Sequence, residues 1–227
     1  MRLVATSDTH FFVDPSIIPP GDVFVHGGDL MDRGYESEWN DLLSWLEALP
    51  HEKKYLVPGN HDFHLVNYPG PALQDLKWVG VEVIGHPLSR KKVTLPNDMI
   101  MIGSPWVTEL KRWAYNSDEK TIHEYMMSLG PADVVISHSP IYGSLDEVVV
   151  STKKQFTEAG LVEESQYKNT GIKAYEVYRK RFNPKVWIHG HIHEDYGHVK
   201  VDNTDIFNVC LCDINYKHRN PPLVLEL

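Results

Sequence analysis

Residues 23–34 read VFVHGGDLMDRG, a short apolar run that leads directly into two glycines and a carboxylate. The glycines let the backbone turn sharply and approach a ligand closely, so Asp29 could serve as a metal ligand. Gly-Asp pairs also form ordinary solvated turns, and this stretch alone does not separate the two interpretations. What links it to the rest of the chain is the placement of polar residues where an apolar run ends.

Four more apolar runs end in polar clusters of the same kind. They are residues 3–10 (LVATSDTH), 55–62 (YLVPGNHD), 134–140 (VVISHSP) and 186–193 (VWIHGHIH). Open α/β sheets bind their ligands at the carboxyl ends of parallel strands, and five clusters at such positions are hard to attribute to chance. We therefore expect the five clusters to meet in one site.

The whole chain alternates short runs rich in Val and Ile with segments of helical period, which indicates an α/β fold. One helix is expected over residues 36–49, where Trp39, Leu42 and Leu46 form an apolar stripe and Pro50 follows. Two more are expected, one capped by Ser117 or Asp118 and ending at Leu129, the other over residues 171–182. Strands are expected over residues 2–6, 22–26, 54–57, 80–84, 99–102, 133–137, 185–189, 199–201, 206–209 and 223–225.

The segment 141–169 is polar and weakly periodic. Long connections without clear structure are more often functional than decorative, so we expect a loop or lid insertion on the functional face. No repeat, low-complexity tract or linker divides the chain. We expect residues 1–227 to form a single domain.

The polar clusters supply seven oxygen and nitrogen donors and no thiolate. These donors are Asp8, His10, Asp29, Asn60, His138, His191 and His193. A single zinc ion usually takes four ligands, so the set better suits two ions that share a carboxylate. Imidazole, carboxylate and amide donors do not choose among metals; we favour Mn²⁺, with Fe, Zn, Ni and Mg as alternatives. Two such ions would clamp a phosphoryl group and activate a water molecule.

Composition excludes several other classes of protein. The formal net charge of −9 repels long polyanions, which disfavours a protein that wraps nucleic acid. No stretch has the roughly 20 apolar residues of a membrane helix, and residues 1–3 open directly into a strand-like run, so we expect a cytoplasmic protein. Cys210 and Cys212 are too close in sequence for a disulfide framework and are expected to be buried reduced thiols.

The order of the motifs resembles that of the calcineurin-like metallophosphoesterase superfamily. The matching motifs are Asp-x-His at 8–10, Gly-Asp-x-x-Asp-Arg-Gly at 28–34, Gly-Asn-His-Asp at 59–62, His138, and Gly-His-x-His at 190–193. Softer motifs at 103–106, 143–146 and 220–222 resemble the small metallophosphoesterase-domain proteins related to class III cyclic-nucleotide phosphodiesterases. The resemblance implies a four-layer α/β/β/α sandwich with the metals at one edge of two sheets.

The resemblance also implies a role for each motif residue. Asp8, His10 and His193 would hold one metal ion, Asn60, His138 and His191 the other, and Asp29 would bridge both ions beside a hydroxide. Three residues would act on the substrate: His61 would protonate the leaving oxygen, Asp32 would hold the His61 imidazole, and Arg33 would bind a phosphate oxygen. Together with Asn60, His61 and Arg33 would contact the substrate. His26 and His189 are expected to be packed behind the ligands.

The leading hypothesis is a phosphodiesterase that hydrolyses small cyclic or short nucleotides. Ser139 and the Asp32-Arg33 pair depart from the closest small phosphodiesterases and leave a phosphomonoesterase or a nuclease open; the basic run at 90–92 could serve a nuclease. A non-catalytic binding module would be expected to lose ligands, and here none is lost. Trp106 and Tyr142 could stack on a base or simply pack. No membrane or long nucleic acid is expected as a partner, and a homodimer is left open.

Overall fold

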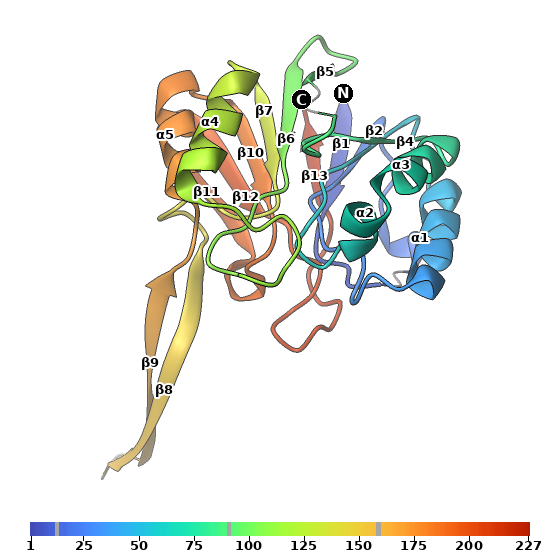
Figure 1. The fold of residues 1–227 in the computed structure, drawn as a ribbon. Helices are drawn as coiled ribbons and strands as arrows, with labels where there is room; N and C mark the ends of the chain where they lie inside the picture. Colours follow the sequence, from blue (N-terminus) through green and yellow to red (C-terminus); the bar gives the residue numbers. More distant parts are fainter. Residues whose placement is uncertain (12–13, 90–91, 158–159) are drawn as a thin grey trace.

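The structure is a computed structural model and describes residues 1–11, 14–89, 92–157 and 160–227. Two members of the basic run, Arg90 and Lys91, lie outside the described residues. Figure 1 shows two β-sheets side by side with helices on their outer faces and a long hairpin that extends from one end. None of the described helices combines the length and the apolar character needed to cross a membrane.

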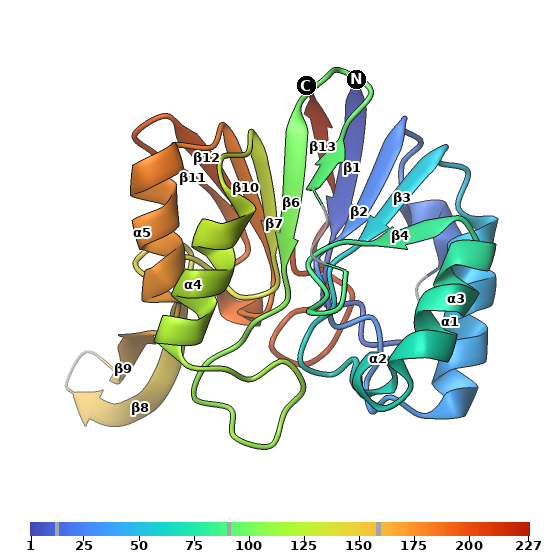
Figure 2. The ribbon, with the colours of Figure 1, turned by 45° about the horizontal axis from the view of Figure 1, so that its top comes forward.

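The first sheet has five strands in the order β13-β1-β2-β3-β4. Strands β1 to β4 run parallel, and β13 pairs with the outer edge of β1 in the antiparallel direction. Its strands are β1 (Arg2–Thr6), β2 (Val23–His26), β3 (Lys53–Leu56), β4 (Val81–Val83) and β13 (Leu223–Glu226). The helices α1 (Glu36–Ala48), α2 (Phe63–Asn67) and α3 (Pro69–Trp78) lie on its side of the molecule, as Figure 2 shows.

The second sheet has six strands in the order β11-β12-β10-β7-β6-β5. Its four inner strands run parallel and its edge strands β5 and β11 run antiparallel. The strands are β5 (Lys92–Thr94), β6 (Ile100–Ser104), β7 (Val134–Ser137), β10 (Val186–His189), β11 (Gly197–Val201) and β12 (Thr204–Asn208). The helices α4 (Glu119–Leu129) and α5 (Lys173–Phe182) cover its outer face.

Three apolar clusters separate four layers, which confirms the α/β/β/α sandwich. One cluster lies between the sheets, one between the first sheet and α1 and α3, and one between the second sheet and α4 and α5. Strand β1 contributes side chains to two of these clusters: Leu3 and Ala5 pack between the sheets, whereas Val4 packs on the side of the helices. A parallel strand buried on both faces must be apolar at successive positions, which is why these runs do not alternate with polar residues.

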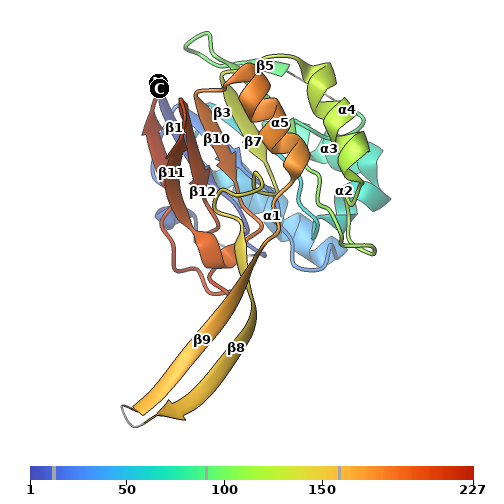
Figure 3. The ribbon, with the colours of Figure 1, turned by 90° about the vertical axis from the view of Figure 1, so that its left-hand side faces the viewer.

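The segment 141–169 differs from the expected irregular loop. Two antiparallel strands, β8 (Glu147–Thr157) and β9 (Gly160–Asn169), pair as a hairpin that projects from the body of the molecule (Figures 1 and 3). A hairpin that does not pack on a sheet has no core to face, so its sequence shows no clean alternation of apolar and polar residues. Its base is fixed by the buried Asp146, whose carboxylate accepts hydrogen bonds from the N–H groups of Gly143 and Gly171 and from the Asn169 amide.

The structure adds short elements that the sequence pattern did not predict. These are α2, α3, β5 and two single-turn 3-10 helices, η1 (Pro15–Ile17) and η2 (His193–Asp195). Helix α3 begins at Pro69, a residue suited to the first turn of a helix because its missing N–H is not needed there. The base of β8 contacts η2, where the Glu147 N–H donates to the Asp195 carboxylate at 3.0 Å. The hairpin is therefore anchored beside His193, while its strands extend away from the sheets.

Candidate metal centre

The five polar clusters meet at one edge of the two sheets. They follow the carboxyl ends of β1, β2, β3, β7 and β10, all of which point to the same edge because they are parallel within their sheets. The sheets are joined there by two backbone hydrogen bonds, Ser7 N–H to Val209 O at 3.0 Å and Leu211 N–H to Ser7 O at 2.8 Å. The structure brings residues of all five clusters together at this edge.

Four of the seven predicted ligands have left-handed backbone conformations. The φ angles are 53° at Asp8, 43° at His10, 55° at Asp29 and 71° at His191. Each such residue costs on the order of 1 kcal/mol or more relative to an extended or right-handed conformation, and such residues cluster at functional sites. The surrounding structure holds the donors in these conformations, which turns their side chains toward one another.

Two glycines let the backbone pass directly behind the carboxylates. A Cβ atom at Gly59 would overlap the side chain of Asp29, and one at Gly190 would overlap the side chain of Asp8. A methyl group at either position would therefore displace a predicted ligand. This is the physical reason for a glycine next to Asn60 and next to His191.

The first donor group contains one oxygen or nitrogen each from Asp8, His10 and Asp29, all within 4.8 Å of one another. His193 joins it, because its Nε2 lies 3.4 Å from Asp8 Oδ1 and 3.2 Å from His10 Nε2. Asp8 is fully buried, and its Oδ1 accepts no hydrogen bond from the described residues. A buried carboxylate oxygen without a donor is costly unless a cation neutralises it.

The second group contains Asp29, His138 and His191. Asn60 joins it through its Oδ1, which lies 2.9 Å from His138 Nε2, while Asp29 Oδ2 lies 3.3 Å from the same nitrogen. Asp29 therefore belongs to both groups, as expected of a carboxylate between two ions.

The ring nitrogens that face the oxygens carry lone pairs in neutral histidines. The Gly27 carbonyl lies 3.0 Å from His138 Nδ1, and the Asp213 carbonyl lies 3.0 Å from His193 Nδ1. A carbonyl can only accept, so it fixes the proton on Nδ1 and leaves Nε2 unprotonated. Each Nε2 lone pair then meets carboxylate or amide oxygens, an arrangement that a cation satisfies. The donors present fit divalent metal ions.

Without a cation, histidine protons must compensate the two carboxylates. Burial by itself lowers the pKa of His138, but Asp29 and Asp8 outweigh this effect and raise that pKa to about 9. Asp8 likewise raises the pKa of His193 against the effect of burial. The pKa of His191, by contrast, is lowered to about 3 by burial and by the nearby His138. The electrostatic field of the cluster thus favours positive charge between its carboxylates.

His26 and His189 are packed behind the ligands, as expected from the sequence. Both are fully buried. The Gly28 N–H donates to His26 Nδ1 at 3.2 Å, so the proton is on Nε2, which bonds the Thr9 hydroxyl at 3.2 Å. Burial lowers the pKa of His26 to about 3 and keeps it neutral. His26 therefore fixes the loop around Asp29 without offering a free nitrogen to a metal.

Asp62 ties two of the ligand loops together. Its buried carboxylate accepts four backbone hydrogen bonds, from the N–H groups of Asp29, Leu30, Met31 and Gly59, at 2.7–3.1 Å. Burial and the neighbouring Asp29 raise the pKa of Asp62 to about 7, while the N–H groups of Gly59 and Met31 oppose that rise. The last residue of the Gly-Asn-His-Asp motif thus has a structural role that we did not assign from the sequence.

We expect Asp62→Ala to lower the free energy of unfolding by about 3 kcal/mol or more, because it leaves several buried N–H groups without an acceptor. Urea unfolding of chelator-treated protein measures this loss without a contribution from bound metal. Asp118→Ala is the matched control: its exposed carboxylate also accepts a backbone N–H, from Thr121, at the start of α4. That change should cost about 1 kcal/mol. Equal losses in the two variants would contradict the role given to Asp62.

His61 lies at the rim of the cluster and is held differently from the expectation. The main-chain carbonyl of Asp32 accepts from His61 Nδ1 at 2.6 Å, so in the neutral ring Nε2 carries the lone pair. The Asp32 carboxylate instead pairs with Arg33 Nε at 3.2 Å, although one of its oxygens lies within 4.8 Å of ring nitrogens of His61 and His10. The expectation that the Asp32 side chain holds the imidazole is corrected, because the backbone already supplies the acceptor.

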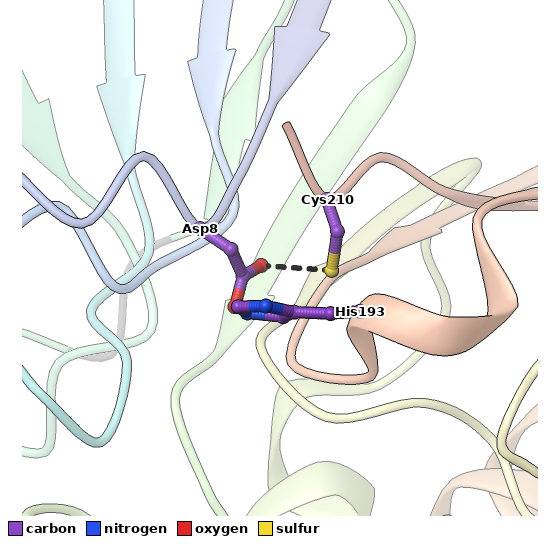
Figure 4. Close-up of side chains that lie close together, drawn as sticks. All are labelled: Asp8, His193 and Cys210. Atoms are coloured by element: carbon purple, nitrogen blue, oxygen red, sulfur yellow. Dashed lines mark hydrogen bonds and ion pairs between the residues drawn. The ribbon is translucent and has the colours of Figure 1, made fainter. Parts of the chain in front are cut away.

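Cys210 is a member of the cluster that the sequence did not indicate. Figure 4 shows its sulfur pointing at the Asp8 carboxylate, with His193 against the same group; the distance from Sγ to Oδ2 is 3.2 Å. Burial and Asp8 raise the pKa of Cys210, so it stays a thiol and donates to the carboxylate. Both cysteines are free and buried, as expected. A sequence signal existed: Cys210 follows β12, another parallel strand that ends at the same edge.

A cleft of about 740 Å³ opens beside the metal centre. It is lined by His61, Asp32, Arg33, Phe63, Arg112, Trp113 and Tyr216. The first three were predicted from the sequence; Phe63, at the start of α2, was not, and neither were Arg112, Trp113 and Tyr216. The last three lie in irregular segments after β6 and β12, where no strand end or periodicity marks them. The volume is within the usual range for a small-molecule site.

Comparisons with known proteins agree with this geometry. The family described as calcineurin-like phosphoesterase matches residues 1–195. Metallophosphoesterase domain-containing protein 1 of Homo sapiens is 30% identical over 245 residues, which cover 100% of this chain and 71% of that protein. A UPF0046 protein of Caenorhabditis elegans is 25% identical over 252 residues, which cover 100% of this chain and 60% of that protein.

A solved structure from Thermus thermophilus has the same fold, with a TM-score of 0.61 at 12% identity. The match covers 91% of this chain and 88% of the other. The fold, the merging of five motif loops at one edge and the extent of the family match all point the same way. The chain belongs to the calcineurin-like phosphoesterase family and is a metal-dependent phosphoesterase.

Proposed function

We propose that this phosphoesterase is a phosphodiesterase that hydrolyses small cyclic or short nucleotides. The observation that carries the proposal is the place of Asp29 in two overlapping donor groups, beside a cleft of small-molecule size. In this proposal Asp8, His10 and His193 hold one ion, and Asn60, His138 and His191 hold the other. Mn²⁺ is the ion we favour, and the same oxygen and imidazole donors also suit Fe, Zn, Ni or Mg.

Two divalent ions bound there supply an activated water molecule and a Lewis acid for the phosphoryl oxygens. The remaining work falls to residues of the chain. His61 lines the cleft, and in the doubly protonated ring its Nε2 can deliver a proton to the leaving oxygen. Arg33 lines the same cleft and can pair with a phosphate oxygen in a planar geometry. Asn60 and His61 lie next to each other, so one loop serves both the metal and the substrate.

The other candidates are outcomes of the same experiment. A phosphomonoesterase would use the same centre, and the exposed Asp32-Arg33 pair is the feature that favours it. A nuclease would have to bind a long polyanion against the net charge of −9. We propose that the hairpin β8–β9 acts as a lid. The support for this proposal is the base of the hairpin, where β8 contacts η2, the short helix that begins at His193. The cytoplasmic location and a homodimer remain predictions.

We expect purified protein to hydrolyse small diesters in the presence of Mn²⁺ faster than the corresponding monoesters and faster than long single-stranded DNA. The test is a panel of these substrates with Mn²⁺, Ni²⁺, Zn²⁺ and Mg²⁺, assayed before and after exhaustive treatment with EDTA. EDTA should abolish hydrolysis, with metal loss confirmed by elemental analysis, because the carboxylates then lose their counter-charge. A preference for monoesters would replace the diesterase proposal, and diester cleavage that survives complete metal removal would refute the metal mechanism.

A further inference from the structure

Two large aromatic side chains beside the metal centre are partly exposed to solvent. Trp113 is 40% exposed and Tyr216 is 53% exposed, and both line the cleft that contains His61. Exposed apolar side chains are common at protein surfaces and need no explanation by themselves. These two differ from the others because they share one cleft and contact histidines of the metal centre.

The contacts form a continuous row of rings across the mouth of the site. Trp113 packs on the His61 imidazole, with 4.3 Å between ring centroids, and His61 packs edge-on against His10 at 4.6 Å. Tyr216 follows on the far side, 4.6 Å from His10 and 5.0 Å from His193. A leaving group near His61 would therefore lie beside Trp113, and one near His10 or His193 would lie beside Tyr216.

The same cleft is cationic in a chain that is acidic overall. Two arginines, Arg33 and Arg112, line the cleft, whereas Asp32 is the one acidic residue among the lining residues. Guanidinium groups suit phosphate oxygens, and exposed aromatic faces suit planar rings, which stack on them with little dependence on ring identity. The wall thus offers one surface for an anion and another for a flat ring.

We propose that Trp113 and Tyr216 form a subsite for a planar aromatic ring, of nucleobase size, on the leaving group of the phosphoester, and that Arg112 binds its phosphate. The inference rests on the proposed function in so far as the ring belongs to a substrate of the same centre. Trp113 also positions His61, and the test must separate the two roles.

Two matched diesters provide that separation: benzyl methyl phosphate and cyclohexylmethyl methyl phosphate. Their leaving groups are primary alcohols of similar size, but only the first carries a flat aromatic ring. We expect Trp113→Leu and Tyr216→Leu each to reduce kcat/KM for the benzyl ester about tenfold more than for the cyclohexyl ester. If a variant acted only by displacing the His61 ring, kcat/KM would instead fall equally for both esters. Equal losses on both esters in both variants would overturn the subsite.

Binding measured by calorimetry tests the subsite without any turnover. Adenosine 5′-monophosphate should bind the Mn²⁺-loaded protein more tightly than ribose 5-phosphate, and both leucine variants should remove most of that difference. Arg112→Gln should weaken both ligands to the same degree. Trp78→Leu, at an exposed tryptophan that ends α3 outside the cleft, and Tyr68→Leu are the controls and should change nothing.

The two arms distinguish failure of the subsite from failure of the proposed function. A wild-type protein that hydrolyses no diester but binds the nucleotide through Trp113 and Tyr216 would refute the diesterase and keep the subsite. A diesterase whose leucine variants retain the full nucleotide preference would keep the proposed function and refute the subsite.

Discussion

Asp29→Ala should reduce the metal content from two ions to one or none, and should lower phosphoesterase activity by about 10³-fold or more. Asp29 is the one carboxylate found in both donor groups, and it is buried, with its Oδ2 3.3 Å from His138 Nε2. Its loss removes one ligand from each donor group together with the negative charge that attracts the cations. Metal content by elemental analysis and the rate on a small diester measure the two effects separately.

Three variants make the result specific. Asp29→Asn keeps an oxygen for the hydrogen bond that the His61 N–H donates to Oδ1 at 2.8 Å, so its effect isolates the lost charge. His10→Ala removes a ligand of one group only and should cost one ion. Asp41→Ala, at an exposed position of α1, should leave both ions in place. A metal content near two in Asp29→Ala would show that Asp29 does not bridge the ions.

The sequence predicted the parts of the site that depend on strand ends. Asp8, Asp29, Asn60, His138 and His191 each follow a strand whose apolar run is evident in the sequence, and parallel pairing brings those ends together. Strand boundaries were close for the same reason: β1 occupies Arg2–Thr6, as the apolar run indicated. The four-layer architecture, by contrast, was reached through the family resemblance rather than from the pattern of apolar residues.

The sequence did not predict the contacts that depend on irregular segments. Trp113 reaches His61 because the loop after β6 is fixed by a backbone hydrogen bond from Ala114 N–H to Asn60 O, and no local pattern encodes that bond. Trp106, which we considered as a stacking residue from the sequence, instead packs edge-on against Tyr125. Tyr142 is exposed, and Lys173 lies over its ring. Position in an irregular loop, and not residue type, decided which aromatic side chain reached the cleft.

Asp32 illustrates the same limit at the level of single atoms. The motif placed it close to His61 correctly, but which of its oxygens accepts from the imidazole depends on the turn at residues 32–34. There the main-chain carbonyl accepts the hydrogen bond and the carboxylate pairs with Arg33.

The hairpin β8–β9 is a second feature that the sequence pattern did not predict. Among the described strands, β8 and β9 pair only with each other, so no packing against a sheet imposes a regular pattern on their residues.

His61 is in neither of the two donor groups that share Asp29, and it can donate a proton from Nε2 when its ring is doubly protonated. Its Nδ1 donates to the Asp32 carbonyl, its ring packs against Trp113 and His10, and the residue lines the cleft. The neighbouring Asn60 Oδ1 points instead at His138. Asp32→Asn is a suitable control for His61, because it keeps the main-chain carbonyl that holds the imidazole.

His61→Ala should reduce the rate on an alkyl or nucleoside ester by about 10² to 10⁴-fold, the usual contribution of a general acid. The loss should be much smaller on a nitrophenyl ester, whose leaving group departs without a proton. Both metal ions should remain, because the variant keeps the backbone N–H that bonds Asp29 and removes no member of the two donor groups that share Asp29. Asp32→Asn should lose far less on either ester. If His61→Ala released a metal ion and slowed both esters equally, His61 would be a ligand, and the proton would have to come from another group.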